Sequence, residues 1–242
     1  MRFFQKNKVV DFYKRVVILK EFISTFVDPN LSFSEKKTKF FVLKKFLTRN
    51  RRFGQYMPYQ SFDKLNLRGQ RDTSMRLSCY PLSYLEDGMS VLDGGCNMGC
   101  LTLTLATDNR LTKSTFVGVD CDKEMIDLAI RLKKVSQAKN LTFYDVAFED
   151  YAMISNLGKF DFILCLAVEA WTNVEFPDFL QKLESVSSSQ SKILIESNNL
   201  DFDNAYIRWE SIKSILFKTK KIIESGQTIG DDVRREWVLF CN

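Results

Sequence analysis

The feature that most constrains this chain is an apolar run that ends in an acid and is followed at once by small residues. The run Val91–Asp93 leads into residues 94–99, which include three glycines, and a helical pattern of leucines begins directly afterwards. A second apolar run, Val117–Asp120, also ends in an acid. Glycine lets a backbone pass close to a ligand, and an acid after the second strand can accept hydrogen bonds from ribose hydroxyls. The pattern therefore predicts a strand, turn, helix, strand unit that binds a nucleoside.

The spacing within the turn indicates which nucleoside. A dinucleotide-binding turn has the form G-x-G-x-x-G, whereas this turn carries Asp93, Gly95, Asn97 and Gly99 at every second position. It resembles the D/E-x-G-x-G-x-G motif of class I S-adenosylmethionine-dependent methyltransferases, with Asn97 in place of the middle glycine. Asn tolerates a left-handed backbone better than most residues, so the departure is mild. The resemblance implies S-adenosylmethionine (AdoMet) as cofactor, with the glycines and Asn97 against it.

From Gly88 onward, apolar runs typical of strands alternate with helical patterns. Such alternation predicts an α/β fold with a mostly parallel sheet covered on both faces. The last two strands have no helix between them, only a loop that contains Gly226, Gly230, Asp231 and Asp232, and they predict an antiparallel edge pair. A seven-stranded Rossmann-like sheet with this edge is the architecture of the methyltransferase family. The expected strands are 90–93, 115–120, 141–144, 160–166, 192–196, 221–225 and 235–241, and the expected helices are 99–107, 123–135, 148–156, 177–186 and 205–217.

Charge divides the chain into two parts. Residues 1–57 hold 14 Lys and Arg against 4 Asp and Glu, whereas residues 58–242 hold 21 against 26. Apolar residues recur at helical spacing in the basic part, which predicts a helical extension on a methyltransferase domain. Packing on that domain, or on a second copy of the chain, is the favoured interpretation. Contact with an anionic membrane or with the phosphates of RNA is the alternative.

The composition excludes several kinds of chemistry. The chain has no histidine, so a Ser-His-Asp relay, a Cys-His pair and a histidine base are all excluded. Its six cysteines lack C-x-x-C spacing, and we expect reduced thiols and no metal site. No apolar run is long enough to cross a membrane. These features predict a cytoplasmic protein.

A basic element precedes the first strand. Residues 68–77 include Gly69-Gln70-Arg71 and resemble the G-Q-R-x-T-x-x-R element of a group of bacterial methyltransferases. A guanidinium group can bind a carboxylate through two hydrogen bonds, and the resemblance implies that Arg71 binds the methionine carboxylate of the cofactor. Arg76 is expected to pair with Asp72, four residues earlier on the same helix face.

The resemblance also implies roles for acids at the strand ends. Asp93 should lie under the amino group of the cofactor, and Asp120 should accept both ribose hydroxyls. Asp145, after the third strand, should accept from the exocyclic amine of adenine, with the backbone of Val146 against the ring; a plain turn acid is the alternative for Asp145. Asp122 is expected to cap the next helix.

The acceptor side is predicted from the fourth and fifth strands. Residues 160–172 resemble the family's fourth strand and the loop after it, which places Leu166 beside the cofactor. Glu169 is a candidate base or substrate ligand, and Trp171 a candidate pocket wall. Glu196 ends the fifth strand, where acids of open α/β sheets face the ligand, and is the second candidate catalytic carboxylate. The loop has neither an N-P-P-Y sequence nor a Pro-Cys nucleophile, which argues against methylation of nucleic-acid bases.

Two resemblances suggest different acceptors. The tail, with Glu196 and Gly226, resembles bacterial methyltransferases of glycan and lipopolysaccharide assembly, whereas the turn and Trp171 also resemble enzymes that cap RNA 5′-phosphates. The first is favoured, because the domain is slightly acidic and lacks an aromatic and basic RNA platform. The prediction is O-methylation of a small-molecule or glycan-type acceptor. An RNA methyltransferase that uses the basic extension, and a catalytically silent partner subunit, are the alternatives.

Overall fold

The structure, a computed structural model, describes residues 16–17, 19–48, 57–147, 150–172, 174–198, 200, 203–229 and 234–242. Three predicted features lie wholly or partly outside these residues. They are the first part of the basic extension (1–15) and its end (49–56), the start of the helix expected at 148–156, and residues 230–233 of the last loop.

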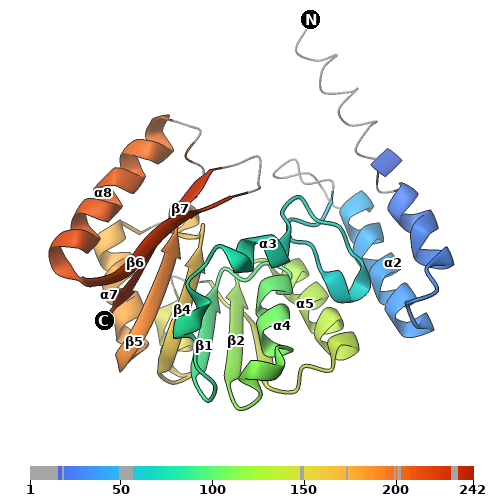
Figure 1. Ribbon diagram of the computed structural model, residues 1–242, viewed down its shortest axis with the longest axis horizontal. Coiled ribbons are helices and arrows are strands. Elements are labelled where there is room, and N and C mark those ends of the chain that lie inside the picture. Colours follow the sequence, from blue (N-terminus) through green and yellow to red (C-terminus); the bar gives the residue numbers. More distant parts are fainter. Residues whose placement is uncertain are drawn as a thin grey trace, which may run out of the picture.

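A seven-stranded sheet in the order β3-β2-β1-β4-β5-β7-β6 forms the centre of the molecule (Figure 1). The first five strands pair in parallel, and β7 runs antiparallel to both β5 and β6. This is the expected α/β, Rossmann-like methyltransferase sheet with one antiparallel edge pair. The strands are β1 (Ser90–Gly94), β2 (Thr115–Asp120), β3 (Leu141–Asp145), β4 (Phe160–Leu166), β5 (Ser187–Glu196), β6 (Lys221–Thr228) and β7 (Arg235–Cys241).

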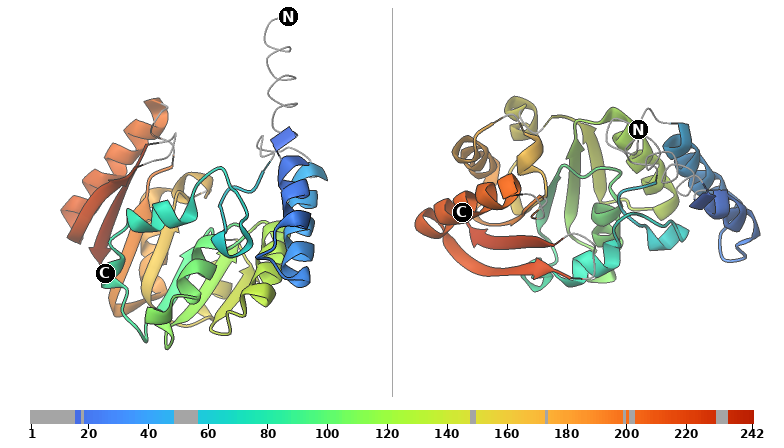
Figure 2. Two further views of the ribbon diagram at one scale, coloured as in Figure 1. Left: turned by 45° about the vertical axis from the view of Figure 1, so that its right-hand side comes forward. Right: turned by 90° about the horizontal axis from the view of Figure 1, so that it is seen from above.

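Helices cover both faces of the sheet (Figure 2). Side chains of α4 and α5 share one apolar core, and those of α7 and α8 share the other. Strands buried on both faces explain the nearly continuous apolar runs in the sequence. The helices are α2 (Phe33–Thr48), α3 (Thr73–Ser78), α4 (Cys100–Ala106), α5 (Lys123–Ser136), α6 (Tyr151–Ser155), α7 (Phe176–Ser185) and α8 (Asp203–Thr219), and residues 19–27 are also helical.

The predicted elements match these closely, with one clear difference in β5. This strand begins at Ser187, five residues before the expected start, and its first residue pairs with Phe160 ahead of a bulge. Residues 187–191 are polar, so no apolar alternation marks them as a strand.

The described part of the basic extension packs on the methyltransferase domain. Leu43 and Phe46 of α2 are buried in the core shared with α5. The Phe41 ring lies 4.0 Å from the guanidinium carbon of Arg131 on α5. Ser32 and Glu35 form a capping box at the start of α2, with the Ser32 amide donating to the carboxylate at 2.8 Å. No helix in the described residues is long and apolar enough to cross a bilayer.

Candidate active site

The carboxyl ends of β1 to β5 meet at one edge of the sheet, because these strands are parallel. The turn after β1 has the left-handed backbone predicted for it, with φ of 73° at Gly95, 55° at Asn97 and 70° at Gly99. A Cβ on Gly99 would lie 2.4 Å from the ring of Phe143 on β3. Glycine is therefore required there by both backbone conformation and space, because the turn packs closely on the Phe143 ring.

Asp120 lies beside this turn and is held by backbone amides. One of its carboxylate oxygens accepts from the Asn97 amide at 2.8 Å, and the other accepts from the Asp122 amide at 2.9 Å. Asp122 caps α5 as expected. The Asp120 carboxylate is thus fixed between two loops, at the end of β2 where the ribose hydroxyls of the cofactor are expected.

Asp93 is buried at the end of β1 with 3% of its surface exposed. Burial raises the pKa of its carboxyl to about 7; the Thr102 hydroxyl, which donates to it, and the charge of Arg76 only partly offset this effect. An adjacent cation would favour the charged form. The site therefore suits the amino group of the cofactor, as the sequence predicts.

Asp145 and Val146, the two residues expected to contact adenine, are less clearly arranged for a ligand than Asp93 and Asp120. Asp145 ends β3 and lies partly exposed, 3.7 Å from the Lys123 ammonium. The Val146 amide donates to the Asp120 carbonyl at 3.1 Å, and the Val146 side chain is buried. A backbone contact from Val146 to an adenine ring would therefore have to use an atom other than this amide.

The loop after β4 carries strain and a buried acid. Leu166 ends the strand, and Ala167 follows with a φ of 64°, a conformation that non-glycine residues rarely adopt. Glu169 is 4% exposed, and burial raises the pKa of its carboxyl to about 7, partly offset by Arg208 and Arg235. Its Oε2 atom is buried without a hydrogen-bond partner in the described residues. This carboxyl is suited to accept a proton near neutral pH.

Trp171 lies on the same loop but at the surface. Its side chain is 62% exposed, and its amide donates to the Val168 carbonyl at 2.8 Å. In this conformation it forms a rim beside Glu169 and not a buried wall.

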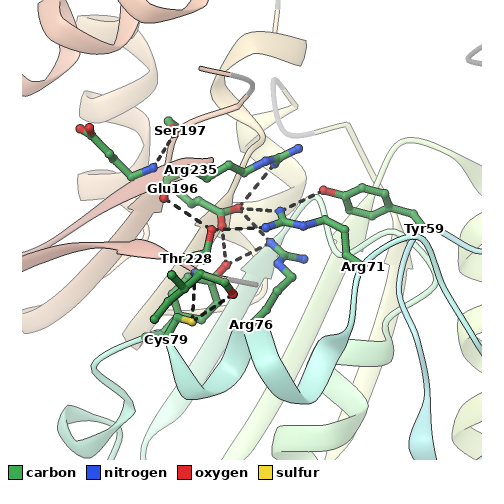
Figure 3. Close-up of polar contacts among 11 residues, drawn as sticks. Tyr59, Arg71, Arg76, Cys79, Glu196, Ser197, Thr228 and Arg235 are labelled. Carbon is green, nitrogen blue, oxygen red and sulfur yellow. Dashed lines mark hydrogen bonds and ion pairs between the residues drawn. The ribbon is translucent and has the colours of Figure 1, made fainter. Parts of the chain in front are cut away.

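Glu196 ends β5 at the centre of a buried ion cluster (Figure 3). Its Oε1 accepts from the Tyr80 hydroxyl at 2.7 Å. Its Oε2 lies 2.9 Å from an Nη of Arg76, 3.5 Å from one of Arg235 and 3.6 Å from one of Arg71. We call these three arginines around Glu196 the arginine cluster. Burial raises the pKa of Glu196, but the arginines outweigh this effect and hold it below its usual value. Such a carboxylate is a poor base, which leaves Glu169 as the better candidate.

The expected pairing of Arg76 with Asp72 is wrong. Asp72 instead caps α3, accepting from the Met75 amide at 2.8 Å, while Arg76 reaches across to Glu196. A buried guanidinium needs a buried counter-charge, and Asp72 is exposed at the helix start. Arg71 donates to the Tyr59 hydroxyl at 3.3 Å and to the Thr228 hydroxyl at 3.4 Å.

Some residues of the site are not evident in the sequence. The Gln60 side chain accepts from the Cys100 amide at 3.0 Å and thereby caps α4, and Tyr80 and Arg235 belong to the cluster around Glu196. Arg235 has one sequence signal, because it alternates with Trp237 and Leu239, two core residues of the same strand face.

Comparison with known proteins identifies the family of this chain. Residues 85–233 match the protein family described as a methyltransferase domain. The mitochondrial ubiquinone biosynthesis O-methyltransferase of Dictyostelium discoideum is 30% identical over 135 residues, which cover 52% of this chain and 40% of that protein.

Solved methyltransferase structures share the fold. The bifunctional kinase-methyltransferase WbdD has a TM-score of 0.57 at 20% identity, over 76% of this chain and 43% of that one. Magnesium protoporphyrin IX methyltransferase from Synechocystis PCC 6803 has a TM-score of 0.51 at 16% identity, over 70% of this chain and 76% of that one.

The chain spans less than half of the curated relatives it matches, with 40% and 43% of their length covered. The family match itself covers more than half of this chain and contains the turn, Asp120 and Glu196. The chain therefore belongs to the methyltransferase-domain family, and residues 85–233 form its AdoMet-dependent methyltransferase domain.

Proposed function

We propose that the enzyme methylates an oxygen atom of a small-molecule or glycan-type acceptor that binds at the ends of β4 and β5. The observation that carries this proposal is Glu169, a buried carboxyl with a pKa raised to about 7 and an oxygen that has no hydrogen-bond partner among the described residues. The relative from Dictyostelium discoideum is an O-methyltransferase by name, which is consistent with oxygen chemistry.

The reaction requires that the cofactor and the acceptor are held in line, and that one group takes a proton from the acceptor. The bound cofactor supplies a methyl group on a sulfonium, whose electron pair returns to sulfur as the carbon–sulfur bond breaks. The turn and Asp120 would hold the cofactor, and the acceptor hydroxyl would attack from the side of β4. Glu169 would take the hydroxyl proton, because its pKa near neutrality suits a base.

The described part of the basic extension favours a packing role over an RNA-binding one. The Lys39 ammonium is buried, donates to the Asn66 carbonyl and lies 3.5 Å from the Glu21 carboxylate. The Lys45 ammonium lies 3.3 Å from the Glu124 carboxylate. The six cysteines all lie in described residues and form no disulfide there, which is consistent with the prediction of a cytoplasmic enzyme. Peripheral membrane contact and assembly of a homo-oligomer through the N-terminal helices stay predictions.

Cofactor binding is tested by isothermal titration with AdoMet and S-adenosylhomocysteine (AdoHcy). We expect micromolar binding to the unaltered protein and loss of binding in Asp120→Ala, with Asp127→Ala, an exposed acid of α5, as the matched control. No binding of either ligand to the unaltered protein would contradict the assignment and direct the search to a partner subunit role.

The base is tested by a screen of nucleotide-sugars, glycans and RNA for acceptor-dependent AdoHcy release, followed by a pH profile. We expect Glu169→Gln to lose the rise in kcat through about pH 7 and to lower kcat by roughly 100-fold or more. Glu175→Gln, an exposed acid, should leave the profile unchanged. A Glu169→Gln profile equal to that of the unaltered enzyme would exclude Glu169 as the base.

A further inference from the structure

The arginine cluster brings buried guanidinium groups around one carboxylate of the described residues, that of Glu196. Three guanidinium groups face the single carboxylate of Glu196, and Arg71, Arg76 and Arg235 are 4%, 2% and 7% exposed (Figure 3). Burying a charge is costly unless another charge pairs with it. Among the described residues, Arg76 and Arg235 both pair with the one carboxylate of Glu196, so these two guanidinium groups carry more positive charge than that carboxylate neutralises, in a place where water cannot screen it.

Some hydrogen-bond donors of the arginine cluster also have no acceptor among the described residues. The Nε of Arg76 and the Nε of Arg235 are buried and have no hydrogen-bond partner in the described residues, and one Nη of Arg235 has only the ion pair with Glu196 at 3.5 Å. Buried donors are nearly always satisfied, so leftover donors on two neighbouring guanidinium groups indicate a missing acceptor. Guanidinium groups match carboxylate and phosphate oxygens in geometry.

The arginine cluster lies close to both the predicted cofactor site and the candidate base. The charge of Arg76 acts on the buried carboxyl of Asp93, and that of Arg235 acts on Glu169. Glu196 ends β5, and Arg235 begins β7 beside it, since Trp237 of β7 pairs with Glu196. The cluster therefore lies at the same sheet edge as the turn and the candidate base.

We propose that Arg76 and Arg235 bind an oxyanion, a carboxylate or a phosphate, on the methyl acceptor. This inference rests on the proposed function and names its substrate class: an acceptor with a hydroxyl for methylation near Glu169 and an anionic group anchored in the arginine cluster. The oxyanion is the anchor and not the nucleophile, because guanidinium groups on an oxygen reduce its electron density. Glu196 holds the arginines in place for this group.

The test is titration of inorganic phosphate into the enzyme saturated with AdoHcy, with acetate as a second probe. We expect binding to the unaltered enzyme, and affinity lower by about tenfold or more in Arg235→Gln, as loss of a charged hydrogen bond predicts. Arg234→Gln is the matched control, because the neighbouring Arg234 side chain is 66% exposed and pairs with Glu236. Its affinity for phosphate should be unchanged. Arg235→Lys keeps the charge and should retain part of the binding if Arg235→Gln proves unstable.

The cofactor's own carboxylate is the other source of an oxyanion, and the same proteins distinguish it. If Arg76 and Arg235 anchored the cofactor, phosphate would compete with AdoHcy, and Arg235→Gln would weaken the binding of AdoHcy itself; that result would overturn the proposal. Equal phosphate affinity in all variants, or no phosphate or acetate binding to the AdoHcy complex, would also overturn it. Failure of AdoHcy to bind at all would instead reject the proposed function, so the two failures are distinct.

Discussion

The cofactor half of the site, at the ends of β1 to β3, is held mainly by backbone, whereas the acceptor half, at β4 and β5, is held by side chains. In the first half, backbone amides of neighbouring loops hold the Asp120 carboxylate, and the turn after β1 has its conformation from residues with positive φ. In the second half, Glu196 is paired with arginines of α3 and β7, and Arg76 is 120 residues away in the sequence. The cofactor half should therefore lose binding when altered, and the acceptor half should lose stability.

The largest expected effect is that of Glu196→Ala. Removing the carboxylate takes the paired charge away from the buried guanidinium groups of Arg76 and Arg235, so we expect a loss of about 3–5 kcal/mol in the free energy of unfolding. Urea unfolding followed by circular dichroism measures it. Asp120→Ala should change the same free energy by much less while removing cofactor binding. Equal stability of the two variants would contradict the contrast between the halves.

Gly99→Ala tests directly whether the backbone conformation of the turn supports the cofactor half. The new Cβ would meet the Phe143 ring, and a φ of 70° adds strain, so we expect about 2–3 kcal/mol lower stability and weaker AdoHcy binding. Gly88→Ala is the control, because Gly88 also has a positive φ but no atom within 4 Å of its Cβ position. It should lose about 1 kcal/mol through strain alone and bind AdoHcy normally. Equal losses in the two variants would mean that the Phe143 contact is unimportant.

The same contrast explains what the sequence can predict. The turn, Asp93 and Asp120 lie within 30 residues, and their types and spacing are enough to locate the cofactor half. The fold is likewise predictable, because an apolar run marks each strand of the sheet and helical periodicity marks the helices between them. The arginine cluster is not predictable in this way. Its members come from the segment around α3, from the end of β5 and from the start of β7, which become neighbours only in the folded protein, so local rules pair Arg76 with Asp72.

The pH dependence of cofactor binding sharpens the role predicted for Asp93. Its pKa in the free protein is about 7, and the cofactor's cationic amino group should lower it, so binding releases a proton near neutral pH. The affinity for AdoHcy should therefore fall by up to about tenfold per pH unit below 7 and level off above about pH 8. Titration in buffers of different ionisation enthalpy measures the released proton. Asp93→Asn should remove the dependence and Glu169→Gln should keep it; the reverse pattern would assign the effect to Glu169.

The smallest expected effect is at the surface of the cofactor half, where α2 packs on α5. The Lys45 and Glu124 side chains are 41% and 49% exposed, so solvent screens their attraction. Lys45→Met should therefore change the free energy of unfolding by no more than about 1 kcal/mol. Leu43→Ala on the same helix should cost about 2–5 kcal/mol, because Leu43 is 1% exposed in the core. If the extension instead bound RNA, Lys45→Met would lower RNA affinity and Leu43→Ala would act only through unfolding. Filter binding of RNA to both variants, beside their unfolding curves, separates a packing element from a nucleic-acid surface.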